Sequence, residues 1–281
     1  MTRLRAVSGG GNDFLALVEP ARDPAAGEIA AWCARGLSLG ADGVFTLRRA
    51  GDGRVAMRYW NADGREAALC VNGTRCAARL AFALGWVDGA VTIETGAGAI
   101  VARPAGATAI ALELSPPAAP PALRTLVAAA GDVEGWFVDV GVPHFVVPWP
   151  RSLADCPVAG LGRELRRHGA FAPAGSNVDF VRFPARHRLE IRSYERGVEA
   201  ETLACGTGVL AAVATGLALG RLALPVAALT RGGFELAVAG EADGARIRRW
   251  ELAGDARLLG EIELGADAGL PPPAPPRWSE G

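Results

Sequence analysis

A stretch of sequence occurs twice in this chain, and each copy carries one cysteine at the same point. The first copy spans residues 57–85 around Cys70, and the second spans residues 191–220 around Cys205. In both copies a strand-like segment and a polar turn lead to the cysteine. A glycine follows three residues after it, and another glycine closes an apolar run fifteen residues after it. A duplicated half-domain that presents one thiol per copy predicts two similar domains whose thiols face one cleft.

Two opposed thiols have a definite chemical use. One can accept a proton from a carbon atom while the other donates a proton to the opposite face, and together they invert a stereocentre. A free cysteine is usually a small buried hydrophobe, and that alternative would hold for either residue alone. The equivalent places of Cys70 and Cys205 in a repeat favour a functional role.

Each of the two cysteines directly precedes an expected helix, over residues 74–84 and 206–219. Helix starts have unpaired N–H groups and the positive end of the helix dipole. We therefore expect a lowered thiol pKa and a thiolate that is accessible near neutral pH. The same amides, at residues 71–73 and 206–208, can hold a substrate carboxylate.

Composition excludes several classes of protein. With 281 residues, half of them hydrophobic, the chain can bury a sizeable core. Its formal net charge is −1 and it has no basic stripe, which argues against nucleic acid as a partner. We expect no secretory signal, because the first ten residues lack an apolar segment. The most apolar stretch, residues 209–230, is interrupted by glycine, arginine and proline, which argues against a membrane span. Five cysteines, an odd number, indicate reduced thiols in the cytoplasm.

The chain contains no lysine, so all 29 basic residues are arginine. A pyridoxal phosphate enzyme needs a lysine for its Schiff base and a Walker loop needs one for its phosphates, so both are excluded. The glycines at residues 9–11 lack the dinucleotide-binding spacing. Three scattered histidines give no metal-ligand pattern. We expect neither a cofactor nor a metal.

The segment at residues 206–219 is apolar or small on every side, so a helix there must be buried all round. Residues 74–84 form its counterpart, with Arg75 and Arg79 along one polar edge. The predicted fold class is α+β: two similar domains, each a curved β-sheet or barrel wrapped around a central apolar helix, with the active site in the interdomain cleft. We also expect strands at residues 12–19, 55–60, 108–114, 136–140, 178–183, 189–194 and 234–239, a helix at 28–37, and an exposed helix face at 163–168.

Four prolines in residues 115–121 cannot continue a helix or a central strand, and we place a domain boundary there. The N-terminal half, residues 1–117, carries Cys70 and is joined by the last strand, about residues 257–264. The C-terminal half, residues 118–256, carries Cys205. We expect the proline-rich tail at residues 265–281 to be disordered.

Several short motifs follow one another along the chain. They are Gly11-Asn-Asp-Phe14, Asn61-Ala-Asp-Gly64, Cys70-x-Asn-Gly-x-Arg75, Pro143-His144, Ser176-Asn-Val178, Glu195-Arg-Gly197 and Ala204-Cys-Gly-Thr-Gly208. In this order, and up to about Leu264, the chain resembles the pyridoxal-independent diaminopimelate epimerases. The resemblance implies two α/β domains of mirrored topology with the active site between them. It also implies conversion of LL-2,6-diaminopimelate to the meso form, a precursor of lysine and of peptidoglycan.

The resemblance also implies roles for individual residues. Cys70 and Cys205 would be the acid–base pair, and His144 and Glu195 would tune the pKa values of the two thiols. The residues implied in substrate binding are Asn12, Asn61, Asn177, Glu195 and Arg196, chiefly at the distal end, and Asn72, Gly206, Thr207 and the amide of Val71 at the reacting end.

The chain departs from the family pattern at four places. Val71 replaces the usual glycine after the first cysteine, Val142 replaces an asparagine before Pro143-His144, and Ser8 stands where histidine is common. The stretch at residues 198–202 is one residue longer than the commonest form. None of these changes touches a thiol, so the reaction type is better supported than the substrate.

Three alternatives stay open. One is a cofactor-independent racemase of another amino acid on the same fold, similar to proline racemase. Another is an isomerase similar to the phenazine-pathway enzymes, which lack the cysteine pair. The third is a non-enzymatic amino-acid-binding protein, which would have no need of opposed thiols. A homodimer is a possible assembly under each of them.

Overall fold

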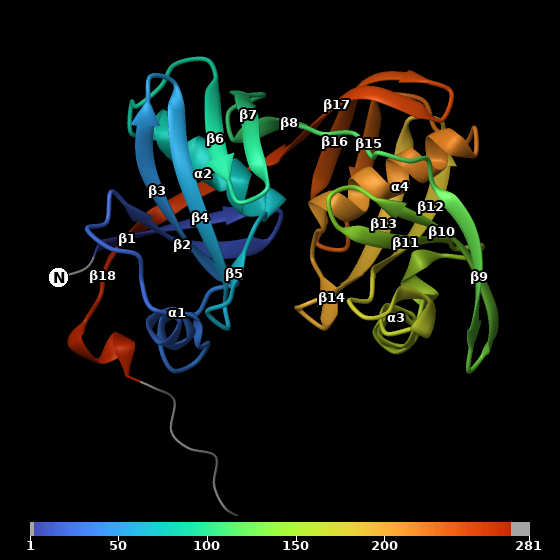
Figure 1. Cartoon of the computed structure of the whole chain (residues 1–281), viewed down its shortest axis with the longest axis horizontal. Coiled ribbons are helices and arrows are strands. Elements are labelled where there is room, and N and C mark those ends of the chain that lie inside the picture. Colours follow the sequence, from blue (N-terminus) through green and yellow to red (C-terminus); the bar gives the residue numbers. More distant parts are fainter. Residues whose placement is uncertain (1–2, 271–281) are drawn as a thin grey trace, which may run out of the picture.

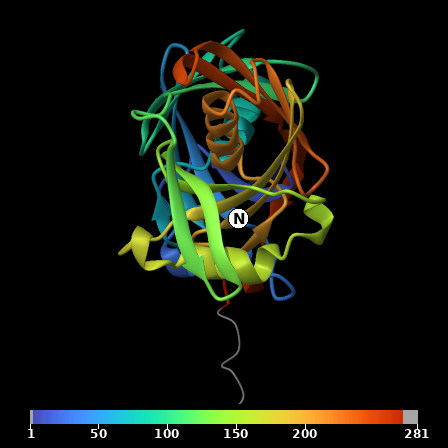
Figure 2. The same ribbon diagram turned by 90° about the vertical axis from the view of Figure 1, so that its right-hand side faces the viewer.

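Two thirteen-residue helices, α2 (Val71–Ala83) and α4 (Gly206–Ala218), are the centres around which the strands of this chain are arranged. The computed structural model describes residues 3–270. Figure 1 shows α2 within the strands of one half of the molecule and α4 within those of the other. Figure 2 looks along the long axis and shows both helices, one behind the other, inside the surrounding strands. The predicted α+β fold with two similar halves is confirmed.

Burial explains why these two segments are helical centres. Residues 208–216 of α4 are all buried, as are residues 71–78 of α2. Small alanines from both helices, including Ala77 and Ala211, belong to one hydrophobic cluster that runs through both halves. The expected polar edge of α2 is wrong in one respect, because Arg75 is completely buried and only Arg79 is partly exposed.

The two helices also end alike. α2 and α4 have capping residues Leu84 and Leu219 with nearly identical backbone angles, and each is followed by a glycine with φ of +66°. Gly85 and Gly220 adopt the left-handed conformation that terminates helices and that glycine enters without a steric penalty. The two glycines that close the sequence repeat therefore have the same structural function.

The first half contains the strands that precede the proline-rich connector, together with one short helix. These elements are β1 (Arg3–Gly9), β2 (Asn12–Val18), α1 (Ala26–Cys33), β3 (Gly43–Gly51), β4 (Arg54–Asn61), β5 (Glu66–Ala67), β6 (Val91–Thr95), β7 (Gly98–Pro104) and β8 (Ala109–Leu114).

The second half contains the strands that follow the connector. Its elements are β9 (Ala122–Ala128), β10 (Gly131–Asp139), β11 (Pro143–Pro148), η1 (Leu153–Asp155), α3 (Val158–Arg166), η2 (Gly169–Phe171), β12 (Asn177–Ala185), β13 (Arg188–Glu195), β14 (Ala200–Thr202), β15 (Val226–Leu229), β16 (Glu235–Asp243) and β17 (Arg246–Asp255).

The strand pairing repeats between the halves. In the first half β2 runs parallel to β3, β3 pairs antiparallel with β4, and β4 pairs with β5 at one end and β6 at the other. In the second half β11, β12, β13, β14 and β15 have the same relations in the same order. The sequence repeat is therefore a repeat of topology, and it defines which positions of the two halves are equivalent.

Two strand pairings join the halves. β8 pairs antiparallel with β17 of the second half, and β18 (Arg257–Glu263) returns to pair antiparallel with β1. The proline-rich connector lies between β8 and β9, where Trp250 Nε1 donates a hydrogen bond to the carbonyl of Ser115. The division into two independent domains at this connector stays a prediction.

Two further expectations need correction. The helix expected at residues 28–37 ends at Cys33, because the chain then turns and Gly36 takes φ of +81°. The expected disorder from Gly265 onward is wrong for residues 265–270. They include a 3₁₀ turn, η3 (Ala266–Gly269), and Ser38 Oγ donates a hydrogen bond to the carbonyl of Ala268. The rest of the predicted tail, residues 271–281, lies outside the described residues.

Candidate active site at two facing helix starts

Each repeat cysteine is the N-capping residue of its helix. Cys70 Sγ accepts a hydrogen bond from the backbone N–H of Gly73 at 3.4 Å, and Cys205 Sγ accepts one from Gly208 at 3.3 Å. Both cysteines have extended backbone angles, as capping residues do. The Thr207 hydroxyl lies 3.4 Å from Cys205 Sγ. The sequence prediction that each thiol stands at a helix start is confirmed.

The two helix starts lie against each other. A Cβ placed on Gly206 would be 2.8 Å from Val71 Cγ1, so glycine is required at this close approach. Asn72 Nδ2 donates a hydrogen bond of 3.0 Å to the carbonyl of Ala204, the residue before Cys205. The turns that carry the two thiols are therefore in direct contact.

Asn72 is the centre of a polar network on the first half. Its Nδ2 also donates to Asn12 Oδ1 at 2.7 Å, and Asn12 Nδ2 donates to Asp42 Oδ2 at 2.8 Å. Arg75 Nη2 donates to Asn72 Oδ1 at 2.7 Å. Two predicted binding residues, Asn12 and Asn72, are thus brought together, with Asn72 fixed by both of its amide atoms.

Arg75 is a buried cation about one turn into α2. Its Nε donates to the carbonyl of Asp255 at 3.3 Å, where the chain passes from β17 to β18. Its Nη1 is buried without a hydrogen-bond partner among the described residues. Burial lowers the pKa of Arg75, while Cys76, Asp255 and Cys70 favour its charge. The guanidinium therefore connects Asn72, the inter-half strand and the electrostatic surroundings of Cys70.

A second network lies beside Cys205. Asn177 Oδ1 accepts a hydrogen bond from the backbone N–H of Arg196 at 2.8 Å, and its Nδ2 donates to the carbonyl of Pro143 at 3.2 Å. The same Nδ2 lies 3.4 Å from His144 Nε2. On the other side of the ring, His144 Nδ1 lies 2.6 Å from Asp179 Oδ2. Asn177, Arg196 and His144 are therefore brought together as predicted.

Glu195 lies within electrostatic reach of both thiols. Thr202 Oγ1 donates a hydrogen bond to its carboxylate. Burial raises the pKa of Glu195, and the hydrogen bond from Thr202 opposes that shift. The same carboxylate contributes to raising the pKa of Cys70 and that of Cys205. Its position fits the predicted role in tuning thiol acidity.

The thiol pKa values do not follow the prediction from the helix starts. Burial raises the pKa of Cys70 to about 11 and that of Cys205 well above its ordinary value. The amides of Gly73 and Gly208 lower the two values, as expected for helix starts, but loss of hydration outweighs them. Both thiols are therefore protonated near neutral pH. A base must first deprotonate one of them before it can remove a proton from a substrate.

The remaining predicted site residues differ in placement. Gly206 and Val71 are buried where the helices touch, and Thr207 is partly buried beside Cys205. Asn61 is exposed at the end of β4, where its backbone pairs with Gly43 of β3. It neighbours the site through the strand, but none of the hydrogen bonds described here involves its side chain.

Sequence reasoning missed three neighbours of the thiols. Burial raises the pKa of Tyr59, and the nearby Cys70 thiol raises it further. Asp179 and Ser193 form a buried pair, with Ser193 Oγ donating to Asp179 Oδ1 at 2.6 Å. A carboxylate in the middle of an apolar strand was the available signal for Asp179, because a buried charge requires partners.

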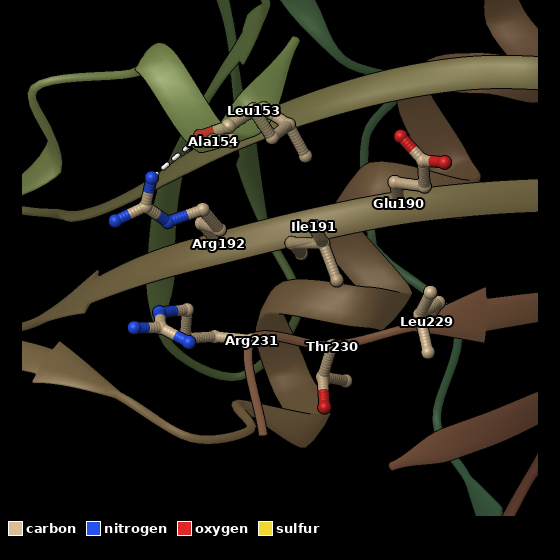
Figure 3. A pocket seen from close by; sticks show the side chains of 8 residues that line it. All are labelled: Leu153, Ala154, Glu190, Ile191, Arg192, Leu229, Thr230 and Arg231. Carbon is tan, nitrogen blue, oxygen red and sulfur yellow. Dashed lines mark hydrogen bonds between the residues drawn. The ribbon is translucent and has the colours of Figure 1, made fainter. Parts of the chain in front are cut away.

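A pocket of about 380 Å³ lies where β13 changes its partner from β15 to β14, and Figure 3 shows the side chains that line it. Its lining includes Arg192, Thr230 and Arg231 but neither repeat cysteine. Arg192 is fully engaged with Glu201 and with two backbone carbonyls. We therefore place the reacting site at the helix starts.

Within residues 3–270 we find neither a membrane-spanning helix nor a cluster of metal ligands. None of the described helices is long and apolar enough to cross a membrane. Within the same residues, no group of three or more His, Cys, Asp or Glu side chains is arranged to hold a metal ion. All five cysteines lie in the described part of the chain, and none is in a disulfide.

Known proteins match this arrangement in sequence and in fold. The family model for diaminopimelate epimerase matches residues 6–112 and 136–249. A diaminopimelate epimerase from Aquifex aeolicus is 39% identical over 210 residues, which cover 73% of this chain and 75% of that protein. One from Methanothrix thermoacetophila is 36% identical over 254 residues, which cover 83% and 88%. A solved hydroxyproline epimerase from Agrobacterium vitis superposes with a TM-score of 0.68, at 16% identity, over 95% of this chain and 93% of that one. The last likeness concerns the fold alone.

Proposed function

The chain belongs to the diaminopimelate epimerase family, and on that premise we propose that it converts LL-2,6-diaminopimelate to meso-diaminopimelate with Cys70 and Cys205 as the acid–base pair. The observation that carries this proposal is the contact between two helix starts that are each capped by one cysteine. The alternative of a bystander role does not account for two thiols at equivalent positions on helix starts that contact each other.

The reaction exchanges one C–H bond for another. One cysteine, as thiolate, removes the α-proton and leaves a planar carbanion whose charge spreads into the α-carboxylate. The other cysteine, as thiol, donates its proton to the opposite face. The α-carboxylate is bound by the backbone amides at the two helix starts, including that of Asn72, and these donors stabilise the charge that develops. No atom is gained or lost, and the two cysteines exchange protonation states.

The initial thiolate needs a proton acceptor. Glu195 is suited to that role because it lies within electrostatic reach of both thiols and because burial raises its pKa toward that of the thiols. His144 contributes a second basic group beside Glu195. A smaller difference in pKa between acid and base makes the proton transfer easier.

The distal end of the substrate is a second amino-acid group, with one ammonium and one carboxylate. We assign its binding to Asn12, Asn61, Asn177, Glu195 and Arg196. The arginine suits the carboxylate, and the glutamate and amide oxygens suit the ammonium. Val142 contributes no polar contact where the family has an asparagine.

The proposed reaction needs no cofactor and no particular assembly. We assign the reaction no pyridoxal and no metal, because the chain has no lysine for a Schiff base and the two thiols suffice for proton transfer. A cytoplasmic location is supported by the unpaired cysteines. The two halves would act as domains around the substrate, and a homodimer is compatible with this chemistry.

The second candidate is a racemase of another amino acid on the same fold. It is favoured by Val142, which removes one contact to the distal end, and by the shared fold with a hydroxyproline epimerase. Incubating the protein in D₂O with diaminopimelate, L-proline, trans-4-hydroxy-L-proline or L-glutamate separates the two. We expect α-deuteration to be fastest with diaminopimelate. Faster deuteration of a monoamino acid would overturn the assignment of substrate.

A further inference from the structure

A buried cluster of three polar side chains lies beneath Cys205. His144 and Asp179 are completely buried, and Ser193 is 3% exposed. Asp179 accepts at both oxygens, from His144 Nδ1 at 2.6 Å and from Ser193 Oγ at 2.6 Å. A buried carboxylate is expensive unless it is hydrogen-bonded in this way. We therefore looked for a functional reason why the Asp179 carboxylate is buried in the core.

The first half has no such cluster at the equivalent place. The equivalence follows from register, because β2, β3 and β4 pair as β11, β12 and β13 do. The aromatic rings of the first half pack edge to face, with centroids 6.0 and 6.4 Å apart. The equivalent pairs are Phe14 and His144, Phe45 and Asp179, and Tyr59 and Ser193.

The hydrogen bonds around His144 determine its tautomer. Asn177 Oδ1 accepts from the N–H of Arg196, so Asn177 Nδ2 is the atom that faces the ring. Nδ2 can only donate, and His144 Nε2 must therefore be the acceptor. The ring proton is then on Nδ1 and is donated to Asp179. Asp179 thus holds an imidazole whose basic nitrogen faces Asn177.

The cluster packs against Gly208 at the start of α4. The equivalent Gly73 of α2 instead lies against Met57. A Cβ placed on Gly208 would be 2.4 Å from Asp179 Oδ1 and 3.0 Å from Ser193 Oγ. The N–H of Gly208 is the donor to Cys205 Sγ. Asp179 also contributes to the raised pKa of Cys205, and it is not among the groups that act on Cys70.

We propose that Asp179 is a positioning residue for the Cys205 half of the reaction: it holds His144 as the Nδ1–H tautomer so that Nε2 can take up the proton that Cys205 releases. The thiol proton passes first to the Glu195 carboxylate, which lies within electrostatic reach of His144. It then reaches His144 Nε2 when the long 3.4 Å contact from Asn177 Nδ2 opens and frees the lone pair. The carboxylate of Asp179 stabilises the imidazolium that results. Charge and protons balance, because Cys205 becomes a thiolate as His144 becomes a cation. This inference rests on the proposed epimerase function.

The test is Asp179→Asn, which keeps the shape and one acceptor but removes the charge. Changes to a residue that orients a reacting group typically cost about tenfold to a hundredfold. We expect kcat with LL-diaminopimelate to fall by at least about tenfold while KM changes by less than about threefold. Asp243→Asn, an exposed position on β16, is the matched control and should change kcat by less than about twofold.

The half-specific readout is α-proton exchange in D₂O, measured by NMR in two single-cysteine backgrounds, each with the diaminopimelate isomer (LL or meso) whose α-proton faces the remaining cysteine. With Cys70→Ala, exchange depends on Cys205, and Asp179→Asn should lower it about tenfold. With Cys205→Ala, exchange depends on Cys70, and the same substitution should leave it within about twofold. An equal loss in both backgrounds would overturn the inference, as would an unchanged kcat. If neither background exchanges protons, the kcat and KM result decides alone.

Two controls keep the outcomes separate. Ser193→Ala removes one donor to Asp179 without altering charge, and it replaces Asp179→Asn if that variant does not fold. We expect a smaller loss of kcat in the same half-specific pattern, and no loss would overturn the inference. If the unmodified protein exchanges no α-proton of diaminopimelate, the proposed function fails. If it does and the variants behave like the control, only this inference fails.

Discussion

The helix starts at Cys70 and Cys205 have the same backbone but different surroundings. Cys70 is partly exposed, packs against the hydrophobic cluster that includes Phe14, Phe45 and Tyr59, and has the Arg75 cation on its own helix. Cys205 is buried, and the equivalent of Arg75 on its helix is the apolar Leu210. Two carboxylates act on Cys205 instead of a cation.

This difference shows how a duplicated unit can supply two chemically distinct thiols. The repeat sets the geometry, because each cysteine must cap a helix to receive an amide hydrogen bond. Burial raises the pKa of both thiols, to about 11 for Cys70 and well above the ordinary value for Cys205. The neighbours then differ, because Arg75 favours the Cys70 thiolate whereas Asp179 opposes the Cys205 thiolate. The two thiols therefore have electrostatically distinct surroundings.

The largest expected effect comes from removing either thiol. Cys70→Ala and Cys205→Ala should each lower epimerisation by about a thousandfold or more, because one face of the carbanion loses its proton donor or acceptor. The measurement is conversion of LL- to meso-diaminopimelate. The buried Cys33 provides the control, and Cys33→Ala should retain activity at a matched fraction of folded protein. Substantial epimerisation by both single variants would show that the thiols are bystanders.

A smaller effect is expected from making the first half resemble the second. Arg75→Leu removes the hydrogen bond to Asn72 and the cation near Cys70. Loss of a hydrogen bond to a charged group costs about 1.5–3 kcal/mol, so kcat/KM should fall roughly tenfold to a hundredfold. Arg79→Leu, one turn further along α2, is the control and should stay near the activity of the unmodified protein. Equal activities of the two variants would refute a special role for Arg75.

Val142→Asn tests the comparison at the distal end of the substrate. Val142 precedes Pro143-His144 as Asn12 precedes Asp13-Phe14 in the first half, so the substitution makes the two halves more alike. A new hydrogen bond should lower the KM for diaminopimelate by about tenfold or less and leave kcat nearly unchanged. Steady-state kinetics with LL-diaminopimelate measures both constants. A fall in kcat without a change in KM would contradict the assignment of this position to binding.

The smallest effect concerns stability at alkaline pH. The folded-state pKa of Cys70 is about 11, against an ordinary value near 9. Its contribution to the free energy of unfolding is therefore full below pH 9 and is lost as the pH rises to about 11. Cys205 should contribute in the same direction. Urea denaturation between pH 8 and 10.5 should show a smaller loss of stability for Cys70→Ala and for Cys205→Ala than for the unmodified protein, and an equal loss in all three would contradict the raised pKa values.

Local features of this chain were predictable from the sequence. The cysteine caps, the apolar faces of α2 and α4 and their closing glycines depend on neighbours within a few residues. The predicted strands overlap β2, β4, β8, β10, β12, β13 and β16, because alternation and β-branched residues are local signals. The family motifs added Asn177 and His144, whose roles no local pattern indicates.

Features that depend on distant contacts were not predictable. Arg75 was expected at a polar helix edge, but the strand that passes from the second half to the first covers it at Asp255. The acidity of the thiols depends on how completely the two halves exclude water, and the helix start alone gives the wrong direction. Asp179 belongs to an apolar strand, and only the register of β11, β12 and β13 places it beside His144 and Ser193.

The central claim is that two thiols act on opposite faces of one carbon, and the isotope content of the product tests it most directly. LL-diaminopimelate is converted in D₂O, and the reaction is stopped at low conversion. The account predicts that meso product contains deuterium at the inverted carbon while the recovered LL substrate contains almost none, because one thiol removes protium and the other delivers deuterium. Product that retains the substrate's protium would show a single base acting on both faces and would contradict the account.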